Sequence, residues 1–73
     1  MPTAPPPSIT LTRIGERVRA TRHALQLTQQ DLADLAGVSD ATVRQIERAT
    51  GKGTLSSMLA VLRVLGLDLE VRG

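Results

Sequence analysis

Arginine gives this sequence most of its capacity to bind a charged partner. Eight of the nine basic residues are Arg, four of them fall within residues 13–22, and Arg44, Arg48 and Lys52 follow at a spacing of four. The planar guanidinium offers paired donors that match the oxygens of a phosphate group. Four of the seven acids gather elsewhere in the chain. This segregation favours an anionic partner, although a solvated helix face is the simpler interpretation of the spacing.

The residue types on which most catalytic and metal sites depend are scarce. The chain has no Cys, a single His, and no glycine-rich stretch of the kind that cradles a nucleotide phosphate. Without Cys there is no disulfide, no thiol nucleophile and no thiolate ligand for a metal ion. We therefore expect a protein that is not an enzyme and that carries no cofactor and no metal.

The apolar periodicity predicts the helices that must position these basic side chains. Residues 1–9 hold all four prolines and almost nothing to bury, so they are expected to form a disordered tail. Residues 10–66 form the predicted domain, with Thr28, Ser39 and Thr54 at N-cap positions. The expected helices cover residues 10–25, 29–36, 40–48 and 55–65.

The two middle helices form the most specific pattern in the sequence. Residues 28–48 read TQQDLADLAGVSDATVRQIER, two short capped segments joined at Gly37, a residue type that tolerates a left-handed turn. The small Ala33 allows the two helices to cross closely. This spacing is that of a helix-turn-helix, in which the second helix enters the major groove of DNA and presents its N-terminal side chains to base edges.

The C-terminal stretch LGLDLEVRG has a different periodicity. Leu67, Leu69 and Val71 alternate with charged residues, which predicts a half-buried β-strand over residues 67–73. No earlier segment offers an equally clear strand, so its backbone groups need a partner. The preceding helix also carries Val61 and Val64 away from its main apolar face, and this surplus apolar surface indicates an interface.

The order of these elements resembles a known family of DNA-binding domains. Residues 14–67 are similar to the Cro/C1-type (XRE) domains of phage repressors, most clearly in LTQQDLADLAGVS and VRQIERATGKGTLSSMLAVLRVLGL. The resemblance implies an all-α, lambda-repressor-like fold of four to five short helices. Within that family the ending LGLDLEVRG is similar to the HipB-like antitoxins, in which the terminal strands of two protomers pair across a dyad. We therefore expect one C-terminal strand that is used in dimerisation.

The resemblance also assigns roles to residues of the two middle helices. Gln29 opens the first of them and matches the glutamine with which the family holds a DNA phosphate. The exposed face of the second is the one that the family directs at base edges. The expected base contacts are Asp40, Ala41, Arg44 and Gln45, and the expected phosphate contacts are Gln29, Ser39, Thr42, Arg48 and Lys52.

Asp40 departs from the family pattern, because phosphate repels an acid. Either it accepts from a cytosine amino group, or it serves only as negative charge in the first turn of its helix, and the sequence leaves both interpretations open. Arg44 also has two interpretations, as a reader of guanine or as a phosphate contact. Arg22 and Glu47 match a pair that the family uses as a partly buried salt bridge between the first and third helices.

The expected partners follow from the dimeric family. They are a second copy of the chain, a palindromic double-stranded operator and, by resemblance to HipB, a HipA-like serine/threonine kinase toxin encoded alongside. The protein would then be an antitoxin that represses its own operon. The predicted dimer interface comprises Val61, Val64, Leu67, Leu69 and Val71.

Two alternatives to an antitoxin stay open. One is a free-standing phage-type repressor without a toxin, and the other is a protein-interaction module that no longer reads DNA. The arginine distribution, Gln29 and Gln45 argue against the second. No apolar run approaches the length of a membrane span and the N-terminus does not read as a signal peptide, so we expect a cytoplasmic, nucleoid-associated protein that binds no membrane.

Overall fold

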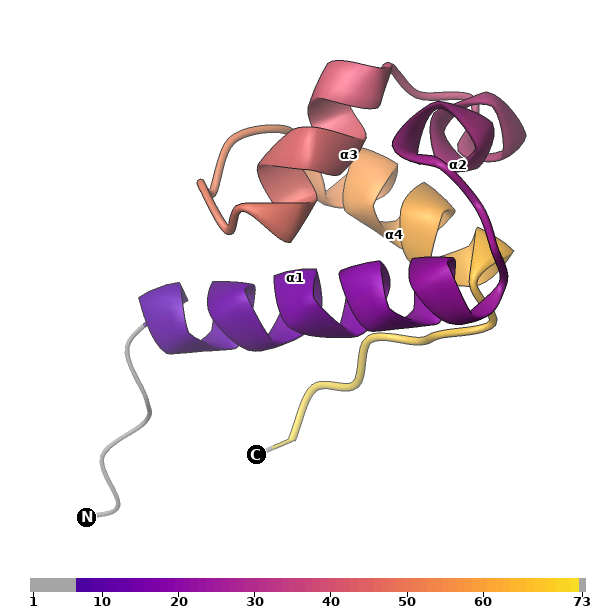
Figure 1. Ribbon diagram of the computed structural model, residues 1–73. Coiled ribbons are helices and arrows are strands. Elements are labelled where there is room, and N and C mark those ends of the chain that lie inside the picture. Colours follow the sequence, from indigo (N-terminus) through magenta and orange to yellow (C-terminus); the bar gives the residue numbers. More distant parts are fainter. Residues whose placement is uncertain (1–6, 73) are drawn as a thin grey trace, which may run out of the picture.

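The computed structural model describes residues 7–72, which form an all-helical domain (Figure 1). The longest helix lies along one side of the molecule, and the others pack above it and behind one another. The helices are α1 (Pro7–Ala24), α2 (Gln29–Ala36), α3 (Asp40–Glu47) and α4 (Leu55–Val64). The helical architecture predicted from the sequence is confirmed for this part of the chain.

The starts of the last three helices are fixed by the predicted N-cap side chains. The hydroxyl oxygens of Thr28, Ser39 and Thr54 each accept from a backbone N–H three residues further on. At α2 the cap is reciprocal, because the Asp31 carboxylate accepts from the Thr28 backbone N–H at 2.9 Å. Such a capping box satisfies two of the otherwise unbonded donors at a helix N-terminus.

The first helix begins three residues earlier than the sequence predicts. Pro7 is its first residue, so residues 7–9 belong to the helix and not to a disordered tail. Proline suits this position because the first helical N–H has no partner to lose and the ring fixes a helical φ. The Thr12 hydroxyl also donates to the Ser8 carbonyl at 2.8 Å. Residues 1–6 of the predicted tail lie outside the described residues.

The core is aliphatic, and contributions from every helix meet in it. Its fully or almost fully buried members are Val18, Leu32, Ala33, Val43, Ile46, Val61, Leu62 and Leu65. One close backbone contact fixes how α1 crosses α3. A Cβ atom on Gly15 would lie only 2.5 Å from the Ile46 carbonyl oxygen and 2.9 Å from that of Glu47. Glycine at this position therefore lets the two helices approach one another directly.

The predicted C-terminal strand is wrong for the chain by itself. Residues 67–72 form no secondary structure, and Figure 1 shows them as a yellow segment that returns along α1. A strand requires a ladder of hydrogen bonds with a neighbouring strand, and residues 7–72 contain no strand that could supply it. Leu67 and Leu69 are half-buried against the core, while Val71 is 94% exposed.

The structure also corrects the role expected of one helix residue. Val61 has no exposed surface and belongs to the core, against which α4 packs together with α2 and α3. It is therefore a core residue of the single chain and cannot contact a second copy. Val64 is half-buried beside it. Among residues 7–72, no helix combines the length and the apolar character needed to cross a membrane.

Candidate nucleic-acid interface

α2 and α3 are joined by a tight turn with the geometry that the sequence predicts. Gly37 has φ of 70° and ψ of 32°, in the left-handed region that glycine adopts without a steric penalty. Its N–H is directed at the carbonyls of Ala33 and Asp34, and the Val38 N–H donates to Ala33 at 3.0 Å. Ala33 is fully buried, so its small side chain allows α3 to pass close to α2.

The second helix of this motif has one buried face and one accessible face. Val43 and Ile46 are buried in the core. The four predicted base contacts are all partly exposed, and so is Thr42, a predicted phosphate contact. The Ser39 and Thr42 hydroxyl oxygens lie 2.9 Å apart at the start of the helix. α3 is thus held by its apolar side and presents polar side chains on the other.

Asp40 and Arg44 form an ion pair on the accessible face of α3. Arg44 Nη1 donates to Asp40 Oδ2 at 2.7 Å, and the two side chains are 43% and 44% exposed. The hydrogen bond from Arg44 and the attraction of its charge lower the pKa of Asp40, and the Ala41 backbone N–H acts in the same direction. Sequence reasoning missed this pair, although a spacing of four on one helix was the signal for it.

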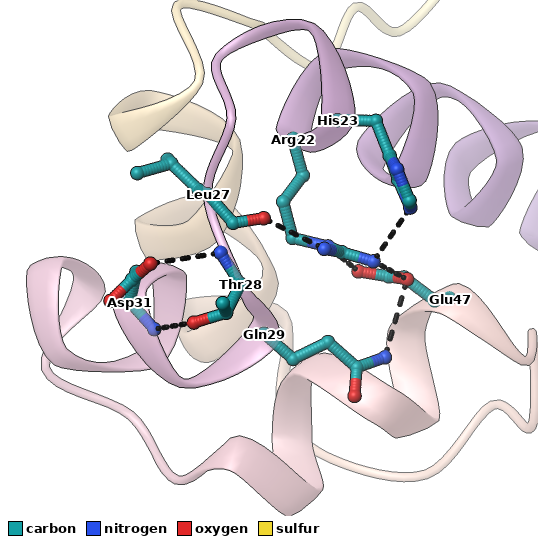
Figure 2. A network of polar contacts seen from close by, with 7 residues as sticks. All are labelled: Arg22, His23, Leu27, Thr28, Gln29, Asp31 and Glu47. Atoms are coloured by element: carbon teal, nitrogen blue, oxygen red, sulfur yellow. Dashed lines mark hydrogen bonds and ion pairs between the residues drawn. The ribbon is translucent and has the colours of Figure 1, made fainter.

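A second ion pair lies buried at the other end of α3 (Figure 2). Arg22 donates through Nε to Glu47 Oε2 at 2.7 Å and through Nη2 to Oε1 at 3.0 Å. Its Nη1 donates to the Leu27 carbonyl at 2.8 Å. The hydrogen bond to Glu47 raises the pKa of Arg22. The predicted salt bridge is present, and it joins the end of α1 and the following loop to the end of α3.

Two further side chains join this buried pair. Gln29 Nε2 donates to Glu47 Oε1 at 3.3 Å, and His23 Nε2 lies 3.2 Å from Arg22 Nη2 (Figure 2). Because arginine is only a donor, this geometry requires His23 Nε2 to be the acceptor. Gln29 is the first residue of α2, so the network orients the side chain that the sequence assigns to a phosphate contact. A carboxamide has a second N–H, which this bond does not use.

The loop after α3 brings another predicted contact toward the same helix. Ala49, Gly51 and Gly53 all have positive φ, so the chain turns sharply between α3 and α4. Gln45 and Lys52 line one hollow of about 320 Å³, which lies between this loop, α3, α1 and α4. Arg48 and Lys52 are both exposed. In residues 7–72, no group of three His, Asp or Glu side chains could hold a metal ion.

Comparison with known proteins shows the family to which the chain belongs. A family of helix-turn-helix domains matches residues 13–73, which is most of the chain. The chain belongs to the helix-turn-helix domain family.

Two proteins similar to this helix-turn-helix domain are a transcriptional regulator and a phage repressor. Over 56 residues it is 34% identical to an uncharacterized HTH-type transcriptional regulator of Sinorhizobium fredii, covering 77% of this chain and 29% of the relative. Over 57 residues it is 35% identical to the immunity repressor protein of Bacillus phage phi105, covering 78% of this chain and 40% of the relative. The helix-turn-helix domain therefore spans less than half the length of either relative.

Proposed function

We propose that this helix-turn-helix domain is a sequence-specific DNA-binding regulator that represses transcription. The observation that carries the proposal is the difference between the two sides of α3. Its apolar side is anchored in the core, and its other side carries the Ala41 methyl, the Arg44 guanidinium and the Gln45 amide. These groups are the types that read base edges in the major groove. The names of the two relatives, a transcriptional regulator and an immunity repressor, support the same function.

We assign base contacts to the accessible face of α3. The Gln45 amide suits a paired contact with adenine, and the Ala41 methyl suits the methyl group of thymine. The proposed phosphate contacts are Gln29 at the start of α2, Ser39 and Thr42 at the start of α3, and Arg48 and Lys52 after its end. This assignment separates residues that select a sequence from residues that fix the position of the protein on the duplex.

Substitution of one residue from each group tests the assignment. Gln45→Ala should weaken binding to the selected site by roughly 1–3 kcal/mol and relax the preference at one position. Lys52→Ala should weaken binding to all sequences alike and make the salt dependence shallower, because one phosphate contact is lost. The measurement is a fluorescence-anisotropy titration of duplexes selected from a random pool, at several salt concentrations. Equal loss of selected and random DNA in Gln45→Ala would contradict the role of Gln45 as a base reader.

We further propose that the active species is a homodimer on a palindromic operator. The backbone N–H groups of residues 70–72 have no acceptor among residues 7–72, so they are available to pair with a second copy. Val64, Leu67 and Leu69 pack against the core and so hold the C-terminal segment on the domain. Val71 is exposed and would meet the partner. Dimeric helix-turn-helix proteins place their two recognition helices about 34 Å apart, one turn of DNA.

An exposed residue gives the sharpest test of the dimer. Val71→Asp should give a folded monomer, because it places two acids near the dyad without removing any core contact. The matched control is Leu25→Asp, the same kind of change at an exposed residue in the turn after α1. Sedimentation velocity measures the mass, and circular dichroism measures the helix content. A wild-type monomer, or a Val71→Asp dimer, would overturn the proposal.

The antitoxin role is a narrower hypothesis, and the phage-type repressor is its alternative. The antitoxin role rests on the likeness of LGLDLEVRG to HipB-like endings, and the description of the phage relative favours the repressor. Titration of a HipA-like kinase encoded beside this gene into the preformed operator complex separates the two. A larger complex that keeps its DNA supports the antitoxin, and no interaction supports the free-standing repressor.

A further inference from the structure

The basic residues around α3 differ in how their charge is balanced. Within residues 7–72 three ion pairs are formed, and the two that involve α3 are Arg22 with Glu47 and Arg44 with Asp40. Arg48 and Lys52 form none in that part of the chain, so their full charge is available to phosphate. Arg44 is different, because a carboxylate balances its charge on an accessible surface. A carboxylate beside Arg44 would not strengthen a contact between Arg44 and a phosphate.

The ion pair presents a definite pattern of donors and acceptors. The bond from Arg44 Nη1 to Asp40 Oδ2 leaves the guanidinium Nε and Nη2 groups as donors and the carboxylate Oδ1 as an acceptor. The joined side chains therefore offer two guanidinium donors and one carboxylate acceptor, and the bond between them is 2.7 Å long. In the major groove a G·C pair presents the N7 and O6 acceptors of guanine followed by the N4 donor of cytosine. The donors and acceptors of the ion pair match these base-edge groups in kind and number, two donors for two acceptors and one acceptor for one donor.

We propose that Asp40 and Arg44 act as one unit that reads a single G·C base pair. This inference rests on the proposed DNA binding and adds the base pair that this turn of α3 selects. Arg44 donates to guanine, while Asp40 accepts from the cytosine amino group and holds the guanidinium away from the phosphates. Asp40 suits this role because an ionised carboxylate can only accept hydrogen bonds, and the bond from Arg44 lowers its pKa further. A nearly neutral pair also gives non-specific DNA little electrostatic reward at this position.

The proposal predicts that the two residues lose the same base preference together. Sites are selected from a randomised duplex pool with wild-type protein, Asp40→Ala, Arg44→Ala and the double variant. Wild-type protein should require G·C at one position of each half-site, and either single variant should lose roughly 5- to 150-fold discrimination there. The double variant should lose no more than either single variant, because the residues act as a unit. Arg44→Lys should also lose the preference, since an ammonium lacks the planar fork.

The salt dependence of DNA binding provides a second readout. It would not change if Asp40 and Arg44 formed an ion pair that does not meet the DNA. On random DNA, Asp40→Ala should steepen the slope of log K against log salt by about 0.9, because the released Arg44 can then neutralise one phosphate. Asp34→Asn is the control, since it removes the same charge from an exposed acid whose partner is Gln30 and not an arginine. Its slope should change by less than that of Asp40→Ala.

The outcomes separate this inference from the proposed function. If wild-type protein selects a site, but Asp40→Ala keeps its G·C preference and its salt slope, the paired reading is wrong and the DNA-binding function stands. If the two substitutions alter different positions, the residues read DNA independently and the inference is overturned. If wild-type protein selects no sequence, both the inference and the proposed function fail.

Discussion

The two ends of α3 carry the same chemistry in opposite surroundings. At each end an arginine nitrogen lies 2.7 Å from a carboxylate oxygen. The side chains of Arg22 and Glu47 are 9% and 5% exposed, whereas those of Arg44 and Asp40 are 43% and 44% exposed. A buried pair cannot lose one member without leaving a charge in the core, and an exposed pair exchanges its partner for water with little loss. The first therefore fixes the position of the helix, and the second is free to meet a ligand.

Removing the arginine of the buried pair should have the largest effect on stability. Arg22→Met leaves Glu47 as an unpaired buried charge, which should lower the free energy of unfolding by about 3–5 kcal/mol. The double variant Arg22→Met/Glu47→Leu should recover much of that loss, because it removes both charges and keeps apolar volume. Urea denaturation followed by circular dichroism measures both. A loss below about 1 kcal/mol in Arg22→Met would place this pair in the same class as the exposed one.

The contact between α1 and α3 near the buried pair should give the next largest effect. Gly15→Ala places a Cβ atom 2.5 Å from the Ile46 carbonyl oxygen, so the helices must separate. We expect the free energy of unfolding to fall by roughly 1–3 kcal/mol, although alanine is the better helix former. The reverse change, Ala20→Gly at an exposed position of α1, measures the helix-propensity contribution alone. An increase in stability for Gly15→Ala would show that the contact is not tight.

The exposed acids should give the smallest effect, and it should depend on pH. The pKa values of Asp31 and Asp40 are lowered in the folded protein, the first by its bonds with Thr28 and the second by Arg44. Their stabilisation is therefore complete above the unfolded pKa, near 3.8, and is lost as the pH falls through the folded pKa. Asp31→Asn and Asp40→Asn should each be slightly less stable than wild type at pH 7. A difference that persists below both pKa values would contradict this origin.

The sequence predicted those parts of the fold that depend on neighbouring residues. Three N-caps and the turn at Gly37 are local patterns, and all are present. The buried pair was found through the family resemblance, because its members are 25 residues apart and their types alone do not show that they meet. The pair of Asp40 and Arg44 was missed, although its spacing was visible on one helix.

The errors arose where a residue depends on a neighbour that the sequence does not name. The period of α4 could not reveal that Val61 is fully buried within the single chain. The alternation of residues 67–72 predicted a half-buried strand at a dimer interface. Leu67 and Leu69 are half-buried against the core of the single chain, and a ladder of hydrogen bonds needs a second strand that the described chain lacks. The early start of α1 at Pro7 was missed because a run of prolines resembles a tail until its last member opens a helix.

The close approach of Gly15 to the end of α3 also has a consequence for how this domain can diverge. The carbonyls of Ile46 and Glu47 leave no room for a larger residue there, so variation at position 15 is under strong steric constraint. The accessible side of α3 carries no such constraint, and surface substitutions usually change stability by less than about 0.5 kcal/mol. Ala41 and Gln45 can therefore change through successive generations while the scaffold stays folded. A lineage of such proteins can acquire new operators one residue at a time without compensating changes in its interior.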